Sequence, residues 1–94
     1  MTIGLVKGRH EMPVDRYVFE QIEDVFNFDG MYSHAVEVLR GIAHVDLYVT
    51  GLTAAVAAVI RACHRCGCEL VLWHYDVSTG EYRPQSILEK GGEE

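Results

Sequence analysis

The sequence is poor in proline, in cysteine and in long apolar runs, and each scarcity excludes a class of protein. Only two of 94 residues are proline while 49% are hydrophobic, which favours one compact domain. The three cysteines are an odd number and argue against a framework of structural disulfides. The longest apolar runs, residues 54–60 and 70–73, are far shorter than the roughly 20 residues that cross a bilayer. We therefore expect no membrane partner.

Basic residues are scarce as well. Eight lysines and arginines stand against fourteen acidic residues, and the formal net charge is −6. This balance disfavours a long nucleic acid held through its phosphates. A small anionic ligand is not disfavoured, because residues 1–16 contain Lys7, Arg9 and Arg16 and can keep a local positive patch. No signal peptide precedes the first apolar residues, so we expect a cytoplasmic protein.

The centre of the chain predicts a strand, a helix and a second strand. Residues 45–49 are β-branched and aromatic, as in a strand. Residues 54–63 are rich in alanine, with Thr53 as the expected N-cap and Gly67 as the expected left-handed residue after the helix. Residues 70–75 are apolar at consecutive positions, the pattern of a strand covered on both faces. Such a unit is a right-handed crossover between two parallel strands.

The two ends of the chain extend this unit into an α/β domain. Residues 2–7 predict a first strand, and residues 81–88 predict a last strand that folds back antiparallel at the sheet edge, where Pro84 is tolerated. The expected architecture is a single small Rossmann-like domain over residues 1–88, with a mainly parallel sheet, a C-terminal antiparallel hairpin strand and helices packed on the sheet. Residues 89–94 predict a disordered acidic tail.

The segment between the first two predicted strands is ambiguous. Apolar residues within 14–28 fit one face of a helix, but residues 16–20 could equally pair as a strand. We favour the helix. Residues 27–30 predict a turn, and residues 31–41 a short helix ended by glycine.

The helix predicted at residues 54–62 is apolar almost all round until Arg61. A helix lying on a sheet normally shows a polar stripe, so its outer side needs a cover. Either the N-terminal helices or a second copy of the chain could supply it. The small alanine side chains favour close helix approach, and we expect a homodimer.

The cysteine-rich stretch at residues 63–68, with the pattern Cys-x-x-Cys-x-Cys and one histidine, could suggest zinc. Structural zinc sites combine two separated pairs of ligands, and no second cysteine pair exists in the chain. Packing of Cys63 and Cys66 at a helix end is the favoured interpretation.

Polar residues follow the two central strands. Thr50, Gly51 and Thr53 come after one strand, and His74 and Asp76 lie at the end of the other. In open α/β sheets, ligands bind beyond the carboxyl ends of parallel strands, where the free N–H groups of a helix N-terminus can hold an anion. Equally, the Thr-Gly-x-Thr stretch could be only a turn and a cap.

The loop after the first strand would reach the same edge. It contains Lys7, Gly8, Arg9 and His10, of which arginine suits phosphate and histidine can exchange a proton near neutral pH. The alternative is that these side chains form solvated surface.

The resulting order of motifs resembles the small CRISPR-associated ring nucleases of the Csx group. The resemblance covers residues 44–85 and consists of a hydroxyl-glycine turn, a helix and a Tyr-Asp turn followed by a glycine and a glutamine, here at Thr50, Gly51, Tyr75, Asp76, Gly80 and Gln85. It implies a minimal Rossmann-like fold, a homodimer or higher oligomer, a cyclic oligoadenylate ligand, and hydrolysis promoted by a divalent metal such as manganese.

The same resemblance assigns catalysis to Asp76 and ligand contact to Thr50 and Gly51. The histidine that the family uses before its last parallel strand is not matched, because residues 65–67 are Arg-Cys-Gly. This departure affects hydrolysis more than binding. The full candidate set is Asp76, His74 and His10 for catalysis, with Lys7, Gly8, Arg9, Thr50, Gly51, Leu52, Thr53 and Gln85 for ligand binding.

Three functions therefore stay open at the level of sequence. The chain could bind a cyclic oligonucleotide messenger and cleave it, since attack by a ribose 2′ hydroxyl needs mainly positioning and a proton acceptor. It could bind the messenger without chemistry, as a sensor or a sponge. It could also be an interaction domain that uses its apolar helix and binds no ligand.

Overall fold

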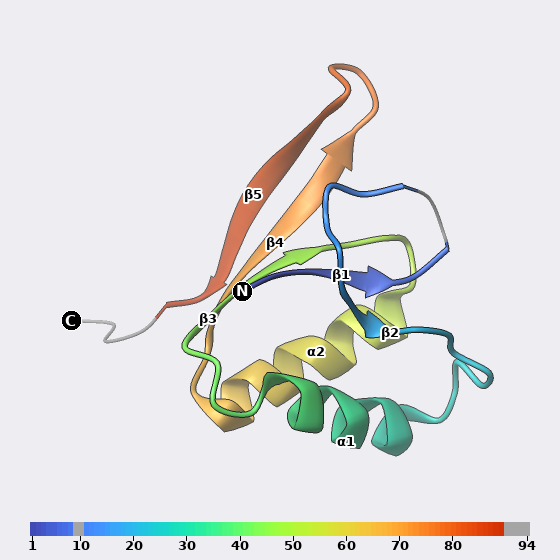
Figure 1. Ribbon diagram of the computed structural model, residues 1–94, viewed down its shortest axis with the longest axis vertical. Helices are drawn as coiled ribbons and strands as arrows, with labels where there is room; N and C mark the ends of the chain where they lie inside the picture. Colours follow the sequence, from blue (N-terminus) through green and yellow to red (C-terminus); the bar gives the residue numbers. More distant parts are fainter. Residues whose placement is uncertain (9–10, 90–94) are drawn as a thin grey trace.

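Five strands form one sheet, and two helices pack on one of its faces (Figure 1). The structure is a computed structural model and describes residues 1–8 and 11–89. The elements in chain order are β1 (Thr2–Val6), β2 (Tyr17–Phe19), α1 (Phe28–Leu39), β3 (His44–Tyr48), α2 (Thr53–Cys66), β4 (Glu69–Asp76) and β5 (Glu81–Leu88). The strand order across the sheet is β2-β1-β3-β4-β5.

The first four strands of that order run parallel, and β5 pairs antiparallel with β4. This arrangement confirms the predicted mainly parallel α/β sheet with a C-terminal antiparallel strand. The β3–α2–β4 crossover is the unit expected from the centre of the sequence, and β5 lies at the sheet edge as predicted. Of the tail predicted at residues 89–94, all but Glu89 lie outside the described residues.

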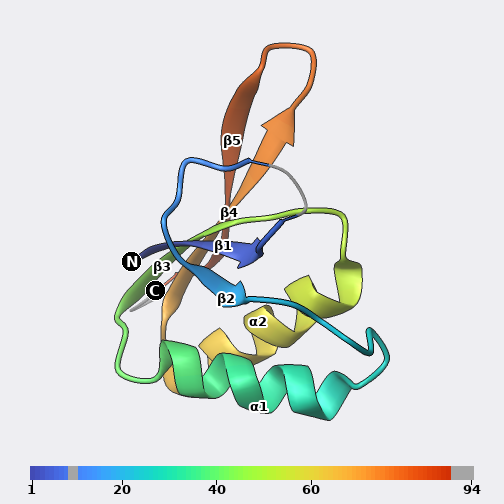
Figure 2. The same cartoon turned by 45° about the vertical axis from the view of Figure 1, so that its right-hand side comes forward.

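The core lies between the sheet and the helices. Alternate side chains of the central strands are fully buried on the helix side, among them Val45, Leu47 and Leu70. Their neighbours point to the other face and are only partly buried. Residues 70–75 are therefore not covered on both faces, as their composition had suggested, because both helices lie on one side (Figure 2).

The helix predicted for residues 14–28 is wrong, and the alternative strand is correct. The N–H of Gly4 donates to the carbonyl of Arg16 at 2.9 Å, and β2 pairs with β1 through Gly4 and Tyr17. A Cβ at Gly4 would lie 2.6 Å from Cδ1 of Tyr17, so the glycine leaves room for that ring. Pairing with a neighbouring strand thus overrides a helical pattern that is local to the segment.

Helix α1 begins earlier than predicted. The Oδ1 atom of Asn27 accepts a hydrogen bond from the N–H of Gly30 at 3.1 Å, so residues 27–30 form a capped first turn and not a separate turn. The helix ends at Leu39. Gly41, which the sequence placed at its end, lies just beyond with a φ of +82°.

Helix α2 has Leu52 at its N-cap position, so the expected cap Thr53 is instead its first residue. At the other end Gly67 is left-handed, with φ +74°, as predicted. Helix α1 lies beside α2 on the sheet (Figures 1 and 2). The apolar α2 is therefore covered by α1 along one flank, one of the two covers that its composition required.

The β4–β5 hairpin projects beyond the rest of the sheet (Figure 1). Tyr48, the last residue of β3, pairs with Trp73, and β4 continues to Asp76. No helix within residues 1–8 and 11–89 is long and apolar enough to cross a membrane.

Candidate functional site

The segments that end or follow β1, β3 and β4 carry most of the predicted site residues. Strands β1, β3 and β4 point the same way, so the segments that follow them share the carboxyl-end edge, as the sequence requires. These segments do not lie at the same level along the strand direction. Asp76 lies three residues beyond Trp73, which at the rise of a strand is about 10 Å past the end of β3. The predicted residues therefore fall into two separate groups, one at the β3–α2 turn and one on the β4–β5 hairpin.

The β3–α2 turn is the part of the edge that best fits an anion. No side chain caps α2, and the first helical bond of the turn runs from the N–H of Val56 to the carbonyl of Leu52 at 3.1 Å. The N–H groups of residues 53–55 consequently have no partner inside the helix. The Oγ1 atom of Thr50 is buried and has no hydrogen-bond partner among the described residues.

Gly51 lies between these groups, and a Cβ added there would meet nothing within 4 Å. The space above its backbone is open, as a close approach by a ligand requires. Residues 49–60 also contain no acidic side chain. The turn therefore offers unpaired donors in a neutral setting.

Of the β1 exit loop, the structure describes Lys7 and Gly8. The Nζ atom of Lys7 lies 3.5 Å from Oε1 of Glu20, just after β2, so its charge is partly matched there. Gly8 has a φ of +87°, which only glycine adopts without strain, and it turns the chain at this point. Arg9 and His10 lie outside the described residues.

Asp76 is held by its own turn. Its Oδ1 accepts from the N–H of Ser78 at 3.0 Å and from the Ser78 hydroxyl at 2.6 Å, and its Oδ2 accepts from Nε of Arg83 at 2.6 Å. These contacts, those of Ser78 first, hold the pKa of the Asp76 carboxyl well below its usual range. A carboxylate stabilised in this way is a weak proton acceptor.

His74 is paired across the hairpin. Its Nε2 lies 2.8 Å from Oε1 of Gln85, and because a carbonyl oxygen only accepts, Nε2 donates. The neutral ring then keeps Nδ1 as an acceptor. By strand alternation, His74 and Asp76 share one face of β4, opposite to Trp73 and Tyr75.

The donor set of the hairpin does not fit a divalent metal. No group of three or more histidine, cysteine or acidic side chains gathers within the described ranges, and both oxygens of Asp76 are occupied by Ser78 and Arg83. A metal ion needs several such ligands with free lone pairs. We therefore derive no step through manganese.

The cysteines belong to the packing of the α2 end. Cys63 and Cys68 are buried, and burial raises the pKa of the Cys63 thiol to about 12. The Sγ atom of Cys68 donates to the carbonyl of Leu39 at 3.7 Å. A thiol with so high a pKa is neither a nucleophile nor a ready metal ligand at neutral pH, which supports the packing interpretation.

Sequence reasoning missed an aromatic cluster on the open face of the sheet. The rings of Tyr48 and Trp73 are stacked, with centroids 5.6 Å apart, and Tyr82 meets Tyr48 edge-on at 4.7 Å. Tyr75 continues the cluster onto the hairpin, 5.3 Å from Tyr82. Aromatic residues at alternate positions of β4 were the available signal, since they point to one face once the strand is placed.

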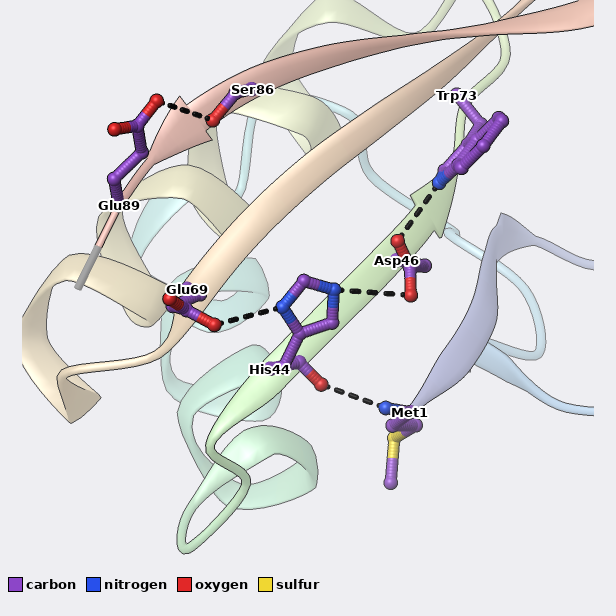
Figure 3. Close-up of polar contacts among 7 residues, drawn as sticks. All are labelled: Met1, His44, Asp46, Glu69, Trp73, Ser86 and Glu89. Carbon is purple, nitrogen blue, oxygen red and sulfur yellow. Dashed lines mark hydrogen bonds and ion pairs between the residues drawn. The ribbon is translucent and has the colours of Figure 1, made fainter.

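A polar network adjoins this cluster towards the amino ends of the strands (Figure 3). The imidazole of His44 lies 3.0 Å from Glu69 and 3.1 Å from Asp46, and Nε1 of Trp73 donates to Asp46 at 3.0 Å. The hydrogen bonds to Glu69 and then Asp46 raise the pKa of His44. This network runs along the open face from His44, at the amino end of β3, to Trp73, and it contains none of the predicted site residues.

A second missed feature is a cavity of about 450 Å³ at the carboxyl end of β2, between residues 20–27 and the start of α1. We call it the acidic cavity. It is lined by Phe19, Glu20, Gln21, Ile22, Glu23, Asp24, Asn27, Gly30, Met31 and His34. Its carboxylates oppose a phosphate. The wrong helix prediction over residues 14–28 hid this loop.

Comparison with known proteins gives no relative for the chain. No family model matches it, and no curated protein or solved structure matches it either. The resemblance to ring nucleases therefore depends on the motifs within residues 44–85 alone.

Proposed function

We propose that the chain binds a cyclic oligonucleotide of the cyclic oligoadenylate kind, with a phosphate held at the β3–α2 turn. The observation that supports the proposal is the buried Thr50 hydroxyl without a partner next to an uncapped helix N-terminus. A buried hydroxyl with no hydrogen bond costs about 1–3 kcal/mol. A phosphate oxygen at the turn would pair with the first N–H groups of α2, and a change of the Thr50 rotamer would bring its hydroxyl to the same oxygen.

The local electrostatics agree with an anionic ligand. The net charge of −6 describes the whole chain, but the twelve positions from 49 to 60 carry no acid. The helix dipole adds a partial positive charge at Thr53. Repulsion by distant surface carboxylates is screened over about 8–10 Å at physiological salt, so a local anion site is compatible with an acidic protein.

Binding is better supported than cleavage. A ribose hydroxyl must lose its proton when it attacks the adjacent phosphate. Asp76 is a poor acceptor because its pKa is lowered, which leaves Nδ1 of His74 as the better candidate. We therefore propose a binding protein, and we assign any cleavage to His74 and not to Asp76.

A second copy of the chain would complete the site around a ring-shaped ligand. Two copies related by a twofold axis would present two β3–α2 turns to two equivalent phosphates. The open face of the sheet favours such a partner, because it presents the aromatic cluster of Tyr48, Trp73 and Tyr82 with both helices on the other side. Sedimentation with and without ligand tests this, and a monomer in both conditions would contradict it.

Thermal unfolding with a panel of cyclic oligoadenylates tests the binding proposal. A ligand at about 100 times its dissociation constant should stabilise the fold by roughly 2.7 kcal/mol. Thr50→Val should lower affinity about tenfold or more, because a hydrogen bond to a charged group is lost. Thr2→Val, at the start of β1, is the matched control and should bind normally. The absence of a shift with every ring would instead favour an interaction domain without ligand.

Incubation with cyclic tetraadenylate, with and without manganese, separates binding from cleavage. After denaturation we expect intact ring to be released. Linear product that disappears in His74→Ala but persists in Asp76→Asn would establish a ring nuclease and the assigned base. Product lost in Asp76→Asn alone would contradict the assignment to His74.

A further inference from the structure

The acidic cavity has an apolar floor beneath its carboxylates. Phe19 and Met31 are buried in the core, and Ile22 packs against that core. The ring of His34 lies 5.4 Å from the ring of Phe19, and its Nε2 donates to the carbonyl of Val18 at 2.8 Å. At about 450 Å³ the cavity has the size of sites that bury a ligand group. An apolar group would therefore be accommodated on this floor.

The charge above that floor is negative and largely unmatched. Glu20 lies near Lys7, but within the described part of the chain neither Glu23 nor Asp24 is paired with a cation. Glu23 accepts from the amide of Gln21 at 3.1 Å, and Asp24 accepts from the N–H of Phe26 at 2.9 Å. Residues 17–39 contain no lysine or arginine. The cavity thus favours a cationic occupant.

Two exposed phenylalanine rings, here called the rim, flank Asn27, which lines the cavity. Phe26 is 76% exposed and Phe28 is 55% exposed, and the two rings meet edge-on with centroids 6.2 Å apart. Phe26 lies in the loop just before α1, and Phe28 is the first residue of the helix; this loop stands at the N-terminal end of α1 (Figure 2). Large apolar side chains in contact at the surface mark interaction sites more often than isolated ones do. A small cation inside the cavity would leave this rim uncovered.

Helix α1 already holds a guanidinium from α2. The Cζ atom of Arg61 lies 3.9 Å from the centroid of the Tyr32 ring, and its Nη1 lies 3.9 Å from Oδ1 of Asp29. A ring and a carboxylate on neighbouring positions of α1 thus already form a place for one arginine. The acidic cavity repeats that combination of aromatic surface and carboxylate, and within the described residues no cation pairs with its Glu23 and Asp24.

We propose that the acidic cavity and its phenylalanine rim bind a basic, amphipathic segment of a partner protein. One apolar side chain of the segment occupies the floor, other apolar side chains cover Phe26 and Phe28, and flanking arginines or lysines pair with Glu23 and Asp24. Charge complementarity selects this occupant. It disfavours a second copy of this acidic chain, and it disfavours nucleic acid. The cavity shares no lining residue with the β3–α2 turn.

A synthetic peptide tests the proposal without knowledge of the partner. We would titrate the ¹⁵N-labelled full chain with an amphipathic peptide of about a dozen residues made of leucine and arginine, and with its counterpart of leucine and glutamate. The basic peptide should shift resonances of residues 20–34, and the acidic one should not. Raising salt from about 0.05 to 0.5 M should weaken binding, because exposed charges are screened.

Charge-neutral variants locate the contact. The double variant Glu23→Gln with Asp24→Asn keeps both acceptor oxygens and should weaken the peptide about tenfold. Glu37→Gln, an acid on α1 outside the cavity, is its control and should change affinity less than about twofold. Phe26→Ser should also cost about tenfold, whereas Val77→Ser, an equally exposed apolar position on the hairpin, should have no effect.

Three results would overturn the proposal. Equal loss in the Glu37 control would mean non-specific attraction to an acidic surface. Spermidine that binds as tightly as the peptide and is insensitive to Phe26→Ser would mean a small cation as the ligand. Self-association of the free chain that Phe26→Ser abolishes would mean that the rim is covered by a second copy.

Discussion

The two strand–helix connections of this fold occupy the same edge of one sheet but are built in opposite ways. The β2–α1 connection is long, acidic and closed at the helix by the Asn27 side chain. The β3–α2 connection is short and free of acids, and α2 begins at Thr53 with Leu52 at its N-cap position and no side-chain cap. The same topology thus offers carboxylates to a ligand at one helix and unpaired donors at the other.

The difference shows how stability and binding compete at a helix N-terminus. Where a side chain satisfies the first N–H groups, as Asn27 does, the helix gains about 1 kcal/mol and offers less to a ligand. Where those groups and the Thr50 hydroxyl are left unpaired, the folded protein loses stability that a ligand can restore. Changes at these two connections should therefore move stability and binding in predictable directions.

The largest expected effect is at the uncapped connection. Thr50→Val replaces a buried, unpaired hydroxyl by a methyl group of similar size and should stabilise the free protein by about 1.5 kcal/mol. It should at the same time weaken nucleotide binding. Urea unfolding measures the first effect and calorimetry the second. A destabilised Thr50→Val protein would show that the hydroxyl is satisfied in solution and would remove the main support for the anion site.

The capped connection should respond in the opposite sense. Asn27→Ala removes the acceptor of the Gly30 N–H and should destabilise the protein by about 1 kcal/mol. Asn27→Asp keeps the acceptor and should stay close to the wild type. Urea unfolding of the three proteins checks this. An unchanged free energy of unfolding in Asn27→Ala would show that the cap does not stabilise α1, and the two helix N-termini would then not differ in stability for this reason.

The sequence predicted the segment before the capped helix α1 less well than the β3–α2–β4 unit that contains the uncapped helix, for a physical reason. The β3–α2–β4 unit is specified by local signals, an apolar run, alanines and a left-handed Gly67, and its architecture was predicted correctly. The β2 strand has only three residues and depends on pairing with β1 across Gly4. Its own pattern fits a helix, so only the long-range pairing reveals that Tyr17 lies in a strand.

The sequence predicted that Thr50 and Asp76 lie at the same edge of the sheet, but not how far apart they lie. Parallel strands place Thr50 and Asp76 at the same edge, and this follows from the crossover alone. The extension of β4 past Trp73 is set by its pairing with β5, and it carries Asp76 away from the turn. The bonds of Ser78 to Asp76 are local to the turn that composition predicted at residues 76–80, whereas the bond from Arg83 depends on the pairing of β4 with β5.

Two glycines sharpen the comparison at a smaller scale. Gly51→Ala has open space and should stabilise the free protein by about 0.5 kcal/mol through the unfolded chain. In α1, a Cβ at Gly30 would lie 2.4 Å from Nδ2 of Asn27. Gly30→Ala should gain helix propensity but lose the cap, and the two effects of about 1 kcal/mol should nearly cancel.

A double variant of Asn27 and Gly30 separates the effect of the cap from the effect of helix propensity. In the Asn27→Ala background the cap is already absent, so Gly30→Ala should now stabilise α1 by about 0.5–1 kcal/mol. Urea unfolding of the four proteins of the cycle measures the coupling. Equal effects of Gly30→Ala in both backgrounds would mean that the Asn27 side chain moves aside without losing its bond.

The smallest expected effect concerns Asp76 on the β4–β5 hairpin. The folded pKa of Asp76 is lowered by Ser78 and Arg83, so its carboxylate stabilises the fold above its unfolded pKa of about 4. That contribution is lost as the pH falls from there through the folded pKa. Asp76→Asn keeps an acceptor for Ser78 but cannot ionise, and it should flatten this part of the pH profile.

Urea unfolding at about pH 5 and about pH 2.5 measures the difference in slope. The other carboxyl groups titrate in both proteins, so only the Asp76 contribution separates the two profiles. The effect should be small because Asp76 and Arg83 lie at the surface, where solvent screens their interaction. If stability depended on pH in the same way in both proteins, the Asp76 carboxylate would not be held by Ser78 and Arg83 in solution. It would then be available as a proton acceptor, and the assignment of cleavage to His74 would have to be reversed.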